Sequence, residues 1–144
     1  MKTTLKINHL AVLVCLILSF VIGFTWYGVL FEEAWMGMVG LDRATVEADP
    51  PGAGEWITNV LSSLAPLYVL AWLFTKLDVR SGLRGAGLAL LIAFSFIFLT
   101  RMTSDMFAKA PYELVWITGG FDMTFLTLSG FILGAWRKEV QSDE

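Results

Sequence analysis

The chain has 144 residues, of which 56% are hydrophobic and 16% charged, with a formal net charge of -3. An ordinary soluble domain carries about 25% charged residues, so this composition predicts a membrane protein without a separate soluble catalytic domain. No basic cluster of the kind that binds nucleic acid is present. The one cysteine, Cys15, lies in an apolar stretch, which excludes an intramolecular disulfide and indicates a packing role.

Four apolar stretches are each long enough to cross a bilayer, at residues 10–31, 56–76, 83–107 and 113–136. A bilayer core of about 30 Å needs about 20 apolar helical residues, and lipid offers no hydrogen-bond partner to an unfolded backbone. The first stretch is too long for a signal peptide and lacks a small-residue cleavage site, so we expect it to be retained. The predicted fold is all-α: a single polytopic membrane domain over residues 1–144 that forms a four-transmembrane-helix bundle.

Lysine and arginine residues are distributed unequally between the two ends of these spans. One side carries only Arg43 and Lys109, whereas the other carries Lys2, Lys6, Lys76, Arg80, Arg84, Arg137 and Lys138. The positive-inside rule therefore predicts cytoplasmic N and C termini.

The first external loop, residues 32–55, is acidic and contains a predicted short helix. Its acidic residues are Glu32, Glu33, Asp42, Glu47, Asp49 and Glu55. Apolar residues recur at helical spacing from Ala34 to Leu41, which predicts an interfacial amphipathic helix with Trp35 as its anchor. Pro50 and Pro51 end this segment before the second span.

Ionisable residues interrupt the third and fourth spans. Arg101 and Asp105 lie four residues apart near the outer end of the third span, and Asp122 lies about 13 Å below the outer end of the fourth. A charge at the bilayer centre costs about 3 kcal/mol or more, so we expect these polar faces to turn toward one another. We expect the planar guanidinium of Arg101 to contact both carboxylates. Asn59 and Ser63 of the second span, at comparable depths, are expected to face them.

Three interpretations of these polar residues stay open. One is an ion pair that fixes helix register, because interhelical polar contacts are ordinary in membrane bundles. Another is an outward-facing site for a small polar ligand, a cation or a proton, since intramembrane ionisable residues tend to mark such sites. Its ligand-binding residues are Arg101, Asp105, Asp122, Asn59 and Ser63. With the span ends placed differently, Arg101 instead snorkels outward.

The sequence predicts no catalytic residue, cofactor or metal site. His9 is the only histidine and lies at the cytoplasmic boundary of the first span, which favours an interfacial hydrogen-bonding role. There is no cluster of histidine and cysteine for a metal, and no P-loop, haem-attachment motif or hydrolase elbow.

A G-x-x-x-G motif at Gly130 and Gly134 lets helix backbones approach closely. This motif is compatible with a homodimer through the fourth span and equally with packing inside one chain.

The run NHLAVLVCLILSFVIGFTWYGVLFEEAWMGMVGL at residues 8–41, with WYG at 26–28 and AWM at 34–36, resembles a family of small bacterial membrane proteins, domain of unknown function 1761. The closing ILGAW at residues 132–136 is similar as well. The resemblance implies a four-helix protein of the bacterial inner (plasma) membrane and implies no reaction.

Three functions compete on this evidence. The first is a non-enzymatic bundle with a ligand site at Arg101 and its neighbours. The second is an accessory or assembly subunit that docks on a larger membrane complex through Trp35, Met36, Met38 and an apolar span face. The third is a lipid-modifying enzyme that uses carboxylates near the headgroups, for which Glu32, Glu33 and Glu113 are candidates although such residues are more often solvated helix ends.

Overall fold

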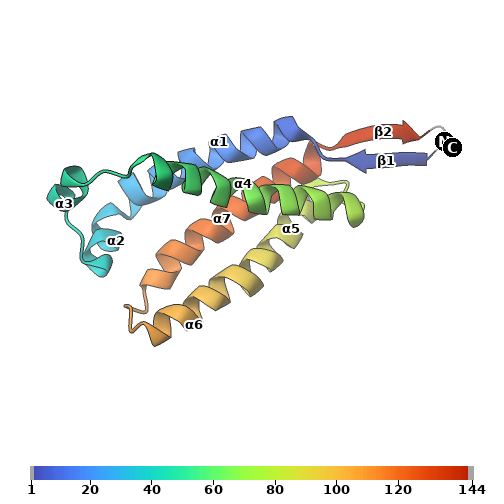
Figure 1. The fold of residues 1–144 in the computed structure, drawn as a ribbon. Coiled ribbons are helices and arrows are strands. Elements are labelled where there is room, and N and C mark those ends of the chain that lie inside the picture. Colours follow the sequence, from blue (N-terminus) through green and yellow to red (C-terminus); the bar gives the residue numbers. More distant parts are fainter. Residues whose placement is uncertain (1, 143–144) are drawn as a thin grey trace.

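The computed structural model describes residues 2–142, and most of this chain is helical (Figure 1). Within that range, four helices are long and apolar enough to cross a membrane: His9–Leu30, Ala53–Lys76, Gly82–Phe107 and Leu114–Ala135. The prediction of a helical membrane protein with four candidate spans is confirmed, with boundaries that shift by a few residues.

The first and third spans each contain a segment of π-helix. The first span consists of α1 (His9–Thr25) and the π-helix η1 (Trp26–Leu30), and the third of α5 (Gly82–Ile92), the π-helix η2 (Ala93–Phe98) and α6 (Leu99–Phe107). Asn8 caps α1, since its side chain accepts hydrogen bonds from the amides of Leu10 and Ala11. π-Helical turns are rare and occur frequently at functional sites.

The remaining helices are α4 (Ala53–Lys76), α7 (Leu114–Ala135) and two short loop helices. These are α2 (Glu32–Val39), which ends at Gly40 in the left-handed conformation, and α3 (Arg43–Ala48), which begins at the cap Asp42. The helix expected in the external loop is thus two helices, and their position at a membrane surface stays a prediction.

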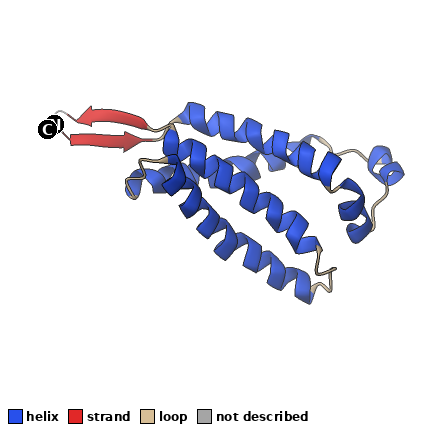
Figure 2. Ribbon diagram, turned by 180° about the vertical axis from the view of Figure 1, so that it is seen from behind, coloured by secondary structure: helices blue, strands red, loops and turns tan. Residues whose placement is uncertain are grey.

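The two tails of the chain form an antiparallel ribbon of β1 (Lys2–Lys6) and β2 (Lys138–Ser142), which the sequence analysis did not predict. The ribbon extends beyond the helices at one end, whereas α2 and α3 lie at the other (Figures 1 and 2). We call these the ribbon end and the loop end of the bundle. The side-chain amide of Asn8 donates to the carbonyl of Trp136 at 3.1 Å and so joins the start of α1 to the end of α7.

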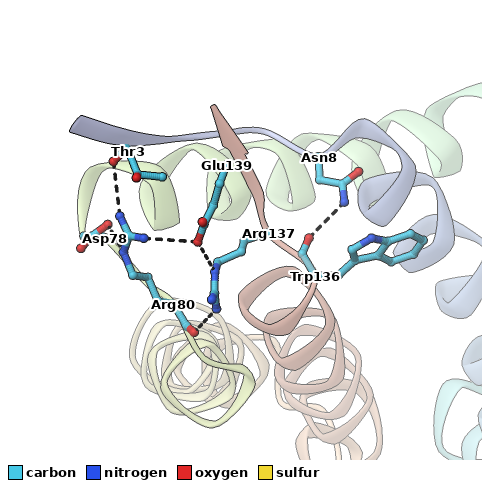
Figure 3. Close-up of polar contacts among 7 residues, drawn as sticks. All are labelled: Thr3, Asn8, Asp78, Arg80, Trp136, Arg137 and Glu139. Atoms are coloured by element: carbon cyan, nitrogen blue, oxygen red, sulfur yellow. Dashed lines mark hydrogen bonds and ion pairs between the residues drawn. The ribbon is translucent and has the colours of Figure 1, made fainter. Parts of the chain in front are cut away.

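Charged side chains tie the ribbon to the turn between α4 and α5 (Figure 3). Arg80 contacts Asp78 at 2.8 Å and Glu139 at 3.2 Å, and Arg137 contacts Glu139 at 2.6 Å. Arg137 also donates to the carbonyl of Arg80. Exposed ion pairs contribute little each, so we assign this cluster a role in orienting the tails.

The tightest packing joins α5 and α7 through glycines. A Cβ placed on Gly130 would lie 2.5 Å from the Cβ of Ala89, and one on Gly134 would lie 2.5 Å from the carbonyl oxygen of Ser81. The G-x-x-x-G face therefore lies against α5 of the same chain. A homodimer remains a prediction, and it would need a surface other than these glycines.

The second span, α4, packs on the bundle mainly through its ribbon half. All of its buried residues lie there, at Leu67, Leu70, Ala71 and Phe74. Toward the loop end, large side chains such as Ile57 and Leu61 are exposed, and α4 diverges from α6 (Figure 1).

Candidate functional site

Arg101 of α6 and Asp122 of α7 form an ion pair in which Nε of Arg101 lies 2.8 Å from Oδ2 of Asp122. The two atoms are in contact without the alignment of a hydrogen bond, and no described donor satisfies the buried Oδ2. The structure thus brings together two charged residues that are 21 positions apart in the sequence and lie on antiparallel spans.

The ion pair joins two residues that lie at different levels along the helix axes. Phe98 lies opposite Gly119, because a Cβ on that glycine would be 2.6 Å from the Phe98 ring. Arg101 comes three residues after Phe98, toward the loop end, and Asp122 comes three residues after Gly119, toward the ribbon end. Their Cα atoms are therefore offset by about 9 Å along the helix axes.

The ion pair closes this offset because helical side chains lean toward the N terminus of their own helix. Arg101 accordingly leans toward the ribbon end and Asp122 toward the loop end. Arg101 is therefore not directed outward along α6, as a snorkelling arginine would be.

The guanidinium of Arg101 keeps unused hydrogen-bond donors. Its side chain is 47% exposed although it is paired, whereas that of Asp122 is 18% exposed. A guanidinium carries five N–H donors, and Asp122 is the one described residue that Arg101 contacts as an ion pair. The pair is thus a half-open polar group between two helices that are long and apolar enough to cross a membrane.

Asp105 does not join this pair. It lines a separate hollow of about 480 Å³ with Met102, Met106, Tyr112 and Val115. The expectation that Arg101 contacts both carboxylates is therefore wrong for this structure. The reason is directional: Asp105 lies one turn toward the C terminus of α6, whereas the side chain of Arg101 leans toward the N terminus.

Asn59 and Ser63 also lie apart from the pair. Asn59 is exposed, and the Ser63 hydroxyl donates to the carbonyl of Asn59 at 3.0 Å within α4. Neither side chain forms a hydrogen bond with Arg101 or Asp122, because α4 diverges from the bundle at this level. The involvement of Asp105, Asn59 and Ser63 in ligand binding stays a prediction.

Aromatic residues surround the loop half of α7. Tyr27 packs on Phe121, the residue before Asp122, with ring centroids 5.4 Å apart. The indole of Trp26 donates to the carbonyl of Ile117 at 2.9 Å, and Phe98 contacts Trp116 at 5.1 Å between ring centroids. Both π-helical segments thus supply an aromatic residue that packs beside Asp122 or one turn from it.

The carboxylates considered for a lipid-modifying enzyme have different surroundings. Glu32 pairs with Arg43, and Glu33 and Glu113 are exposed at helix starts. The docking residues considered for an accessory subunit, Trp35, Met36 and Met38, are partly buried, and Trp35 packs on Tyr27 at 5.4 Å. Both functions stay untested predictions.

Other reactive side chains are used in packing. Nδ1 of His9 lies 3.0 Å from the hydroxyl of Tyr68, and Cys15 is buried beside the carbonyl of Ser129. Across the described part of the chain, no group of three or more histidine, cysteine, aspartate or glutamate residues is placed to hold a metal ion.

Comparison with known proteins gives a family without an activity. The model of the family described as "Protein of unknown function (DUF1761)" matches residues 10–134. No curated protein and no solved structure matches the chain.

Proposed function

The chain belongs to the DUF1761 family, and we propose that it is a membrane-embedded binding protein whose ligand contacts the Arg101–Asp122 pair. The observation that carries this proposal is the state of Arg101, which is fixed by Asp122 through Nε while 47% of its side chain remains exposed. Pairing holds the guanidinium in place, and exposure leaves its terminal amino groups free to bind.

The ligand is a molecule with a negatively charged or strongly polar acceptor group. Because Asp105 lies apart from the pair, one cation meets one carboxylate and no negative charge is left over for a metal cation. The free groups are N–H donors, which bind carboxylate or phosphate oxygens in a planar, bidentate geometry. An acceptor-bearing ligand is therefore preferred to the cation or proton that the sequence also allowed.

The site opens toward the outer half of the membrane in this proposal. The positive-inside rule places the ribbon end, with its seven lysine and arginine residues, in the cytoplasm and the loop end outside. The protein is then a multi-pass protein of the bacterial inner membrane with cytoplasmic termini.

The experiment uses a small carboxylate whose binding is visible when weak. Full-length protein in nanodiscs of zwitterionic phosphatidylcholine is titrated with 4,4,4-trifluorobutyrate and observed by fluorine NMR. Arg101→Gln should weaken binding by about 10-fold or more, the loss expected for one charge-assisted contact. Arg43→Gln is the matched control, because Arg43 is also an exposed, ion-paired arginine but lies in α3. Equal binding by Arg101→Gln and the unaltered chain would overturn the proposal.

A further inference from the structure

An apolar groove lies between α4 and the third span. It has a volume of about 100 Å³ and is lined by Pro66, Val69, Leu70 and Leu73 of α4, by Ala89, Ile92 and Ile97 of α5 and η2, and by Leu126 of α7. Every lining side chain is apolar. The groove exists because α4 contacts the bundle through α1 and α7 and leaves the flank of the third span uncovered.

The groove begins where the polar site ends. Ile97 lies one turn before Arg101 in the third span, and Leu126 lies one turn after Asp122 in α7. Residues one turn apart share a helix face, and both of these positions are on the ribbon side of the charged residues. Arg101 leans in the same direction, which directs its guanidinium toward this end of the groove, although Arg101 itself does not line it.

We propose that the ligand of the Arg101–Asp122 site is a long-chain fatty acid, an inference that rests on the proposed function. The carboxylate binds the free amino groups of Arg101, and the alkyl chain lies in the groove toward the ribbon end. The fit to a fatty acid follows from two features: one guanidinium matches one carboxylate, and the narrow groove of about 100 Å³ holds a segment of a single chain, whereas a diacyl phospholipid carries two.

The arrangement also explains why the site lies within the membrane. Unpaired guanidinium donors and an isolated carboxylate are both unfavourable at this depth, and each satisfies the other when they meet. Contact between the chain and the groove walls adds dispersion attraction, which drives association inside lipid where the hydrophobic effect is weak. A carboxylate with an attached chain is therefore held at two points, and a short carboxylate at one.

The test uses a palmitate analogue with a photoreactive diazirine in the middle of its chain, added to the full-length protein in phosphatidylcholine nanodiscs. After irradiation, mass spectrometry should place saturable labelling, with one label per chain, on residues 66–73 and 89–97. Arg101→Gln should reduce labelling at a fixed low concentration by about 10-fold or more.

Two tryptophan variants of α4 separate groove filling from general damage. Val69→Trp places a large ring in the groove from a residue that is 62% exposed, and it should reduce palmitate labelling by a similar factor. Leu61→Trp is the matched control, because Leu61 is 60% exposed on the same helix but lies outside the groove. Its labelling should equal that of the unaltered chain.

The outcomes distinguish the groove from the polar site. If Val69→Trp loses palmitate but still binds trifluorobutyrate, while Arg101→Gln loses both, the inference stands. If Val69→Trp labels as well as Leu61→Trp, or if a photoreactive phospholipid labels the groove more strongly than palmitate, the fatty-acid assignment is overturned and the polar site survives. If Arg101→Gln binds both probes normally, the proposed function fails together with the fatty-acid inference.

Discussion

The two halves of this bundle are built by opposite means. In the ribbon half, glycines of α5 and α7 bring two backbones into contact, and α1 and α4 pack over them. In the loop half, α4 diverges, aromatic residues replace glycines as the main contacts of α7, and an ion pair with exposed donors lies between α6 and α7. The difference separates stability from the proposed binding: one half is closed and fixes the fold, and the other is open and holds the one ion pair among the described residues that joins two spans.

The largest expected effect comes from breaking the closed half. Gly130→Ala adds a methyl group 2.5 Å from the Cβ of Ala89 and 2.6 Å from the carbonyl oxygen of Gly85, so α5 and α7 must separate. Overpacking of this kind costs about 1–3 kcal/mol, and more where backbone has to move. The free energy of unfolding in a detergent titration should fall by about 3 kcal/mol.

Gly87→Ala is the matched control in the same helix pair. A Cβ at Gly87 meets nothing within 4 Å, so the change should raise helix stability by about 0.5–1 kcal/mol. Equal effects of the two alanines would show that the glycines matter through helix propensity and that the contrast between the halves is false.

Exchanging the charges of Arg101 and Asp122 tests the role of the open half. The double variant Arg101→Asp with Asp122→Arg keeps one guanidinium and one carboxylate between α6 and α7, so a purely structural pair should recover most of the stability lost in Arg101→Gln. That loss should exceed the roughly 1 kcal/mol of an exposed pair, because Asp122, whose side chain is 18% exposed, is left without its partner inside a span. The guanidinium now extends from α7 toward the loop end, away from the groove, so palmitate labelling should stay at least about 10-fold below that of the unaltered chain.

Unfolding measurements and photolabelling on the same preparations check this exchange. Full recovery of labelling by the double variant would mean that the position of the charge is unimportant and would contradict a directional site. Recovery of neither property would indicate that the side chains do not fit in exchanged positions, and Asp122→Asn would then replace the double variant, with weaker labelling expected at little loss of stability.

The helical content was predictable because it depends on local composition. Each span is a long apolar run, and within a bilayer such a run must form a helix because its backbone groups can hydrogen-bond only with one another. The β ribbon was not predictable on these grounds: residues 2–6 and 138–142 pair only because the start of α1 and the end of α7 lie side by side. Short tails of mixed polarity carry no periodic signal of their own.

The candidate site was predictable in its members and less so in its geometry. Counting residues from the span ends placed Arg101 and Asp122 within the membrane, and helical spacing placed each of them on the polar face of its span. The same reasoning also selected Asp105, Asn59 and Ser63, because a helical wheel gives the face of a residue but neither the direction of its side chain along the axis nor the divergence of α4. Tyr27 and Phe98 lie beside α7 because they belong to π-helical segments. A π-helical turn changes the backbone hydrogen-bonding pattern and so shifts the register of the helical residues, and the sequence alone does not reveal such a turn.

The smallest expected effect lies outside both halves, in the loop helix α3. It tests whether the loop helices open independently of the four long helices. Asp42 caps this helix, and hydrogen bonds from the hydroxyl and the amide of Thr45 hold the pKa of its carboxyl below the ordinary value of 3.8. A lowered pKa in the folded state means that the cap contributes above the ordinary value and is lost as the pH falls through the lowered one. Amide hydrogen exchange at Thr45 should therefore become less protected, after correction for intrinsic rates, as the pH falls below about 4.

The control is Asp42→Asn, which caps the helix without titrating and should show no such change. If acidification to this range instead loosened amides throughout α7 as well, the loop helices would be coupled to the bundle, and the open half could not be treated as a separate region.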